Sequence, residues 1–186
     1  MELINQDKRD GYIYDPIIKQ YDTSFWKTTA GTPAISSNLL RFNAAGVASY
    51  IEHIYADFEI QLTVPAVPTS GDVRQWGFIA PATSKLGAAY FDITGTAFTA
   101  KVIDNQGTTT TKTLTWSAGY TATATVFRIR WEADQIFFYI ANVVVASVSA
   151  PTVIIPAFAL PIRILNSNSD NMDMTYMAVR RAASIV

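Results

Sequence analysis

The chain has 186 residues, a formal net charge of −1, and only 16% charged residues. This length fits one domain of ordinary size, and the balanced charge gives no global electrostatic reason to bind nucleic acid or an anionic membrane. The absence of cysteine excludes disulfides, thiolate chemistry and cysteine-ligated zinc, and the single histidine, His53, is a poor basis for a metal site.

Residues 1–23 are predicted to form an N-terminal arm that precedes a β-sandwich domain at residues 24–186. Charges are dense in the arm, Gly11 and Pro16 interrupt it, and its apolar residues keep no long period. The arm is either a terminal strand or loose tail, or a docking arm for a neighbouring subunit. It contains no apolar segment of the kind found in a secretory signal peptide, so we expect synthesis in the cytoplasm without export by that route.

Alternation of apolar and polar residues predicts strands through most of the domain. Phe58, Ile60 and Leu62 alternate with polar residues, which is the pattern of a strand with one buried face. The same alternation predicts strands around Ile129 and Met174. No window shows an apolar stripe of helical period with a cap, so no helix is predicted. Weaker strands are predicted at residues 38–42, 74–80, 88–93, 98–103 and 110–116.

A long uncharged run separates Asp134 from Arg163. A transmembrane helix needs about 20 continuous apolar residues, but Asn142 and Pro151 interrupt this run and two more prolines follow. Valine and isoleucine dominate, which favours strands. The run therefore predicts a hairpin of strands at residues 135–140 and 143–148, followed by a Pro-rich connection, and no membrane partner is expected.

Many short strands with turn residues between them indicate an all-β, two-sheet antiparallel jelly-roll sandwich. The order of the pieces resembles the concanavalin A-like lectin/glucanase superfamily, which includes laminin-G-like and family-16 glycosidase-like domains. Asn142 stands at the family's hairpin turn, although Val143 replaces the usual glycine. The residues that carry the resemblance lie at 25–42, 56–64, 76–80, 88–93, 127–148 and 172–179.

The resemblance implies carboxylates on one strand, because family-16-like enzymes carry them as E-x-D-x-x-E or a close variant. Nothing in the sequence matches this pattern. The nearest pairs are Asp57 with Glu59 and Asp170 with Asp173. Since glycoside hydrolysis needs two carboxylates across the scissile bond, we interpret Asp57 and Glu59 as the solvated side of a strand, and no catalytic residue is predicted.

Four residues on two predicted strands are candidates for ligand binding: Arg74, Trp76, Tyr90 and Asp92. If they share one face, their aromatic and charged groups are suited to a sugar, because a ring stacks on a pyranose and charged groups bind hydroxyls. The alternative is that Trp76 lies in the core and the charges pair structurally.

Two further polar clusters have simpler interpretations. Asn168, Asp170 and Asp173 supply oxygen atoms of the kind that Ca²⁺ prefers. The loop lacks the glycine and closing glutamate of an EF-hand, so a turn between strands is favoured over a Ca²⁺ or sugar site. No other metal or cofactor is expected. Arg128 and Arg130 form an outward basic stripe that we expect to pair with acidic residues.

For function, the sequence favours a non-catalytic structural or interaction protein of a virus or phage particle, as a decoration, fibre or capsid-associated component. A lectin-like domain without a signal peptide or disulfides, with an arm and few charges, fits a homo-oligomer that assembles with protein neighbours in a virion. The alternatives are a carbohydrate-binding module with glycan partners and a glycoside hydrolase-like enzyme.

Overall fold

The computed structural model describes residues 12–14, 26–49, 55–65, 72–79, 87–104, 106–132, 135–149 and 161–181. Within these ranges the regular structure is β-strand except for one short helix, which confirms the predicted all-β class. The elements are β1 (Tyr12–Tyr14), β2 (Trp26–Ala30), β3 (Ala34–Ser36), β4 (Leu39–Phe42), β5 (Ala45–Ser49), β6 (Tyr55–Thr63), β7 (Val73–Ile79), β8 (Ala88–Thr94), β9 (Ala97–Ile103), β10 (Thr109–Thr113), α1 (Gly119–Ala122), β11 (Thr125–Glu132), β12 (Gln135–Ile140), β13 (Val143–Ser149), β14 (Ile162–Asn166) and β15 (Met172–Arg181).

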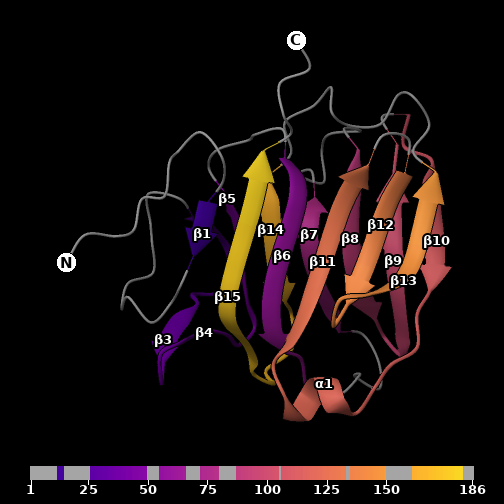
Figure 1. The fold of residues 1–186 in the computed structure, drawn as a ribbon. Coiled ribbons are helices and arrows are strands. Elements are labelled where there is room, and N and C mark those ends of the chain that lie inside the picture. The colour runs from indigo at the N-terminus through magenta and orange to yellow at the C-terminus, as the bar shows by residue number, and fades with distance from the viewer. Residues whose placement is uncertain are drawn as a thin grey trace.

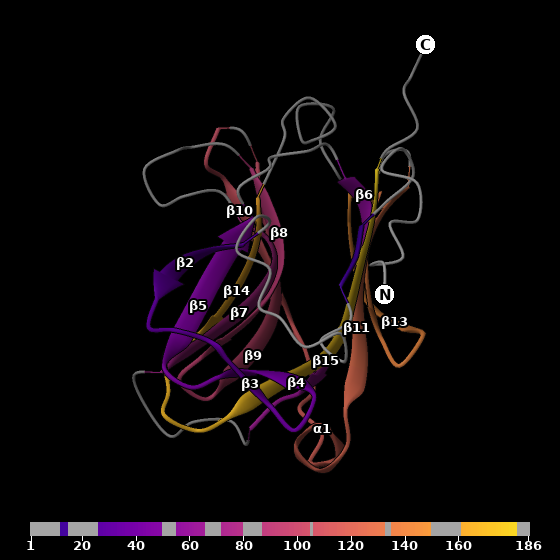
Figure 2. The same cartoon turned by 90° about the vertical axis from the view of Figure 1, so that its left-hand side faces the viewer.

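Two antiparallel sheets face each other (Figures 1 and 2). The first, here called the β6 sheet, has the order β13-β12-β11-β6-β15-β4-β3, with β1 also paired to β15. The second, the β8 sheet, has the order β10-β9-β8-β7-β14-β5-β2. Strands distant in sequence lie side by side in both sheets, as β6 and β15 do, and this confirms the predicted jelly-roll sandwich.

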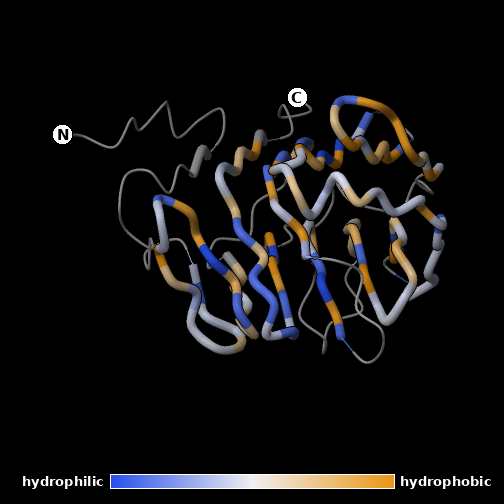
Figure 3. The backbone as a smooth tube through the Cα atoms, turned by 90° about the horizontal axis from the view of Figure 1, so that it is seen from below, coloured by the Kyte–Doolittle hydropathy of each residue, from blue (hydrophilic) through white to orange (hydrophobic). Residues whose placement is uncertain are grey.

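The core lies between the sheets because each strand turns its apolar side chains inward, as period-two alternation requires. Hydrophobic and hydrophilic positions alternate along the strands in Figure 3. At the centre, Trp76 and Phe91 of the β8 sheet stack with ring centroids 5.7 Å apart. Phe127 of the β6 sheet meets Trp76 edge-on at 5.0 Å and Phe91 at 5.4 Å. These contacts join the two sheets.

The predicted hairpin is present as β12 and β13. Its turn residues Ala141 and Asn142 have φ values of 48° and 65°, so both take the left-handed conformation that a two-residue type I′ turn requires. The Ala141 amide donates to the Val126 carbonyl at 2.8 Å, which ties the turn to β11. The absence of glycine is therefore tolerated here. The Pro-rich connection that follows lies outside the described residues.

Two sequence expectations need correction or completion. The expectation of no helix is wrong for α1, a single exposed turn whose four residues are too few to show a helical period. The strand β5 was not predicted, because its Ala-Gly-rich sequence lacks a strong apolar alternation.

Within the part of the chain described, no helix has the length and hydropathy of a membrane span.

The predicted N-terminal arm is described only at β1. There, Tyr12 to Tyr14 pair antiparallel with Val179 to Met177 of β15. The remainder of residues 1–23 lies outside the described residues. The boundary at residue 23 therefore stays a prediction.

Gly77 allows two parts of the core to approach closely. Its φ is +141°, and a Cβ added there would lie 2.6 Å from the Ala89 carbonyl oxygen and 2.8 Å from Ile129 Cδ1. The first of these contacts is to backbone and the second reaches across to the β6 sheet. No side chain fits unless both of these groups move.

We expect Gly77→Ala to lower the free energy of unfolding by about 2–4 kcal/mol, because backbone strain adds to overpacking. Gly95→Ala is the control: Gly95 also has a positive φ, +58°, but nothing lies within 4 Å of its added Cβ. It should lose only about 1–2 kcal/mol. Urea unfolding of both variants measures the difference, and equal losses would contradict the steric explanation.

Candidate functional site

Tyr90 and Asp92 lie on the outer face of the β8 sheet. Phe91 between them is fully buried in the core, so alternation directs its two neighbours to the opposite side. Strand register then sets their neighbours. Lys101 of β9 lies opposite Tyr90, and Gln75 of β7 lies opposite Asp92.

Asp92 is the centre of a polar network on this face and is only 1% exposed. Its carboxylate pairs with Lys101 Nζ at 2.8 Å and accepts hydrogen bonds from Gln75 Nε2 at 2.7 Å and Thr94 Oγ1 at 2.8 Å. Burying a carboxylate is costly unless it is paired and hydrogen-bonded. The network meets that requirement and holds Lys101 and Gln75, both partly exposed, in fixed positions.

Tyr90 extends this face toward β14. Gly77 lies opposite Tyr90 on β7, and Arg163 of β14 lies opposite Gly77. Burial raises the pKa of the Tyr90 phenol; Lys101 and Arg163 act against the increase and Asp92 adds to it. Among the described residues, the buried Nε of Arg163 has no hydrogen-bond partner. The face therefore presents a neutral phenol between two cationic side chains.

The expectation that Arg74 and Trp76 share this face is wrong. Both are fully buried and point inward, because they alternate with the outward-facing Gln75. Trp76 belongs to the aromatic core. Arg74 donates from Nε to Asn166 Oδ1 at 3.2 Å and from Nη1 to the Pro65 carbonyl at 3.4 Å, and burial lowers its pKa. These two residues have the structural role given above as the alternative.

Of the three calcium candidates, Asn168 and Asp173 use their side-chain oxygen atoms within the chain, whereas the Asp170 carboxylate is 66% exposed and lies 4.0 Å from Arg74. Asn168 donates to Asp72 and accepts the Asp170 amide at 2.9 Å, which is the geometry of a turn. Asp173 accepts two hydrogen bonds from Arg41, each 2.8 Å long. Within the described ranges, no group of three or more His, Cys, Asp or Glu side chains could hold a metal ion.

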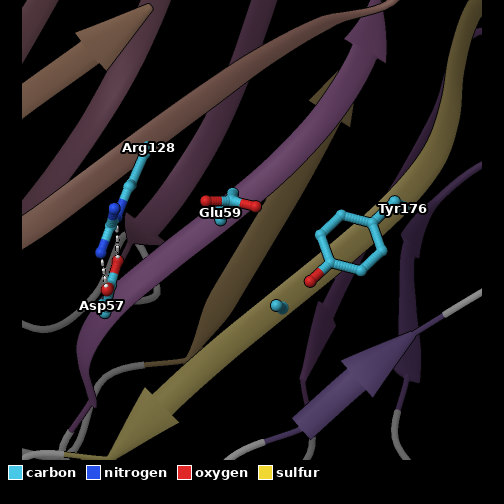
Figure 4. A pocket seen from close by; sticks show the side chains of 5 residues that line it. Asp57, Glu59, Arg128 and Tyr176 are labelled. Atoms are coloured by element: carbon cyan, nitrogen blue, oxygen red, sulfur yellow. Dashed lines mark hydrogen bonds and ion pairs between the residues drawn. The ribbon is translucent and has the colours of Figure 1, made fainter. Parts of the chain in front are cut away.

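The outer face of the β6 sheet carries a second polar feature, a depression of about 100 Å³ lined by Asp57, Glu59, Arg128, Tyr176 and Ala178. Arg128 forms a bidentate pair with Asp57, which raises the pKa of the guanidinium (Figure 4). Asp57 and Glu59 do share a strand face, as predicted. His53 lies outside the described residues.

The predicted pairing of the basic stripe with acidic residues is confirmed. Arg128 pairs with Asp57 as described above. Arg130 pairs with Glu132 at 2.9 Å, and both of these side chains are exposed. A phosphate site on this stripe is therefore not needed to explain its charges.

Three residues near Tyr90 and Asp92 were not predicted from the sequence: Gln75, Lys101 and Arg163. One signal could have found Lys101. The two residues Gly95 and Thr96 form a hairpin turn that sets Thr94 opposite Ala97, and counting back places Lys101 opposite Tyr90. Gln75 and Arg163 belong to strands that pair across long loops, and no local signal gives their register.

No family model and no curated protein matches the sequence, but solved structures do. The fold matches the Crh5 transglycosylase in complex with NAG at a TM-score of 0.74 and 15% identity, over 93% of this chain and 84% of that one. It matches the Bacillus licheniformis β-glucanase at 0.72 and 11%, over 95% and 100%. It also matches the Thermotoga maritima laminarinase catalytic domain at 0.72 and 11%, over 93% and 98%. The chain has the concanavalin A-like jelly-roll fold of these glycosidases.

These comparisons contradict two sequence-based expectations. The protein was expected to be a particle component and not an enzyme, but the structural neighbours are glycosidases and transglycosylases. A lectin-like sandwich without an evident carboxylate motif does not by itself distinguish these classes, because the fold hosts several functions. Identities of 11–15% show a shared fold and transfer no individual site residue.

We expect Tyr90 to be among the last tyrosines to ionise. Its folded-state pKa is raised, so the stabilisation from its neutral form is complete below about pH 10, the unfolded value, and is lost as pH rises through the folded value. Tyrosinate formation can be followed by ultraviolet absorbance as pH rises. Tyr90→Phe should lack one of the tyrosines that ionise last in the unaltered chain. Loss of an early-titrating group instead would contradict this assignment.

Proposed function

We propose that this protein binds a polysaccharide of the β-glucan type across the outer face of the β8 sheet. The observation that carries the proposal is the polar network centred on Asp92, which fixes Lys101 and Gln75 beside Tyr90. An isolated buried charge at the middle of a sheet would destabilise the fold. A fully satisfied one orients its neighbours, as binding sites require.

The groups available on this face suit saccharide hydroxyls. Lys101, Gln75 and Arg163 are partly exposed hydrogen-bond donors on three strands of one sheet. Tyr90 is only 7% exposed and belongs to a cluster with Ile79 and Ala88, so its ring supports this face more than it opens to solvent. Ligand sites commonly combine such rings with a few fixed polar groups, and the fold shared with glucanases supports a glycan as the ligand.

Cleavage or transfer of a glycosidic bond on the same face is a second proposal. It is supported by the position of Tyr90 and Asp92, two residues apart on β8, which puts their Cα atoms roughly 6.6 Å apart. The phenol of Tyr90 is protonated near neutral pH, as an ordinary tyrosine is, and burial raises its pKa further, which makes it a weaker acid. It would give its proton to the leaving oxygen as the glycosidic bond breaks. Water, or a hydroxyl of a second saccharide, would then bond to the anomeric carbon and return a proton to the phenolate, and the Asp92 charge would favour the oxocarbenium-like transition state.

Binding can be tested by calorimetry with oligosaccharides of β-1,3-glucan, mixed-linkage β-1,3-1,4-glucan and chitin. Lys101→Met should weaken binding about tenfold or more, the value of one hydrogen bond from a charged group. Lys112→Met is the matched control, because Lys112 alternates with Thr111, the residue opposite Lys101, and points the other way. If Lys101→Met, Lys112→Met and the unaltered chain bound with equal affinity, the outer face of the β8 sheet would not be the binding site.

The reaction can be tested by mass spectrometry of the same oligosaccharides after incubation. If hydrolysis or transfer products form, Tyr90→Phe and Asp92→Asn should each lower the rate about a hundredfold or more, as loss of an acid–base group does. Tyr139→Phe, on the outer face of the other sheet, is the control. Circular dichroism confirms that the variants fold. If Tyr90→Phe and Asp92→Asn both left the rate unchanged, the roles assigned to Tyr90 and Asp92 would be wrong.

A further inference from the structure

The depression on the β6 sheet arises from one small side chain beside a carboxylate. Glu59 of β6 lies opposite Ala178 of β15, and alternation turns both outward, away from the buried residues Ile60 and Val179. Ala178 fills little of the space between the strands. Tyr176, two residues along the same strand, lines the depression. Figure 4 shows Glu59 between Tyr176 and the pair formed by Asp57 and Arg128.

The charge of this depression is not balanced. Arg128 lies directly opposite Glu59 in the strand register, yet its guanidinium turns to Asp57 and binds both oxygens of that carboxylate. The Cζ atom of Arg128 also lies over the Tyr139 ring, 5.7 Å from the ring centroid. Asp57 is therefore neutralised. No hydrogen bond or ion pair of Glu59 occurs in the described part of the chain, although its charge contributes to the raised pKa of Arg128. With two carboxylates and one guanidinium, the five lining residues carry one net negative charge.

Size then restricts the ligand. The depression has a volume of about 100 Å³, which is less than the roughly 150 Å³ of a cavity that holds benzene. An ammonium group and the first carbons attached to it fit within this volume, and the rest of a larger ligand would project into solvent. Such a cation would pair with Glu59 and could lie within about 6 Å of the Tyr176 ring, the range of a cation–π contact.

We propose that this depression binds a primary ammonium group, with Glu59 as its counter-ion and Tyr176 as its aromatic wall. The site lies on the sheet opposite the face assigned to glycan binding, and it does not depend on that assignment. An amino sugar and a simple alkylamine both carry the required group. The two sources differ in whether contacts beyond the ammonium add to the affinity.

The test is a nuclear magnetic resonance titration of the full chain with glucosamine, glucose and propylammonium. Glucosamine and propylammonium should shift the amide signals around Glu59 and Ala178 with millimolar affinity, and glucose should not. Equal affinities of the two amines would assign recognition to the ammonium alone, whereas tighter glucosamine binding would identify an amino sugar. Absence of a shift with both amines would overturn the proposal.

Glu59→Gln removes the counter-ion with little change in shape and should weaken binding at least fivefold. The matched control is Glu132→Gln, because Glu132 has the same side chain on the same sheet but pairs with Arg130 outside the depression. That variant should bind like the unaltered chain. A similar loss in both variants would indicate general surface charge and would overturn the site. Tyr176→Leu should also weaken binding, since it removes the ring.

Discussion

The contact of Trp76 and Phe91 with Phe127 is the interaction on which the rest of the structure depends. It joins the two sheets at their centre, with Phe127 ring distances of 5.0 and 5.4 Å. Aromatic pairs of this kind contribute about 0.5–1.5 kcal/mol beyond the area they bury. They also decide which side of each strand faces inward. Because Phe91 must face the core, Tyr90 and Asp92 on either side of it must face outward.

Much of the fold was predictable from the sequence, because alternation is a local property of each strand. β6, β11 and the β12–β13 hairpin were predicted in this way, and the structure confirms them. β5 was not, since alanine and glycine carry little hydrophobic signal. The hairpin turn at Ala141 shows the opposite case: two positive φ values occur without glycine, because the surrounding pairing stabilises a conformation that the residues alone disfavour.

The candidate site was less predictable, because it depends on which strands become neighbours. Tyr90 and Asp92 could be proposed from one strand, but their partners come from β7, β9 and β14. Arg74 and Trp76 were placed on the wrong face for a specific reason. In β7 both sides of the strand are rich in buried residues, so composition does not identify its inward side. The contact of Trp76 with Phe127 of the other sheet does so.

A spacing of two residues places two side chains on one face of a strand, but their neighbours across the register decide what chemistry follows. On β6 this spacing gives Asp57 and Glu59, and Arg128 neutralises only the first, which leaves a single negative charge at a depression. On β8 it gives Tyr90 and Asp92, where Lys101, Gln75 and Thr94 satisfy the carboxylate and burial raises the pKa of the phenol. The fold places one such outward-facing pair on each of the two sheets, and the chemistry of a pair is not decided by the fold. The chemistry of the two pairs differs because their cationic neighbours differ, Arg128 on the β6 sheet and Lys101 on the β8 sheet.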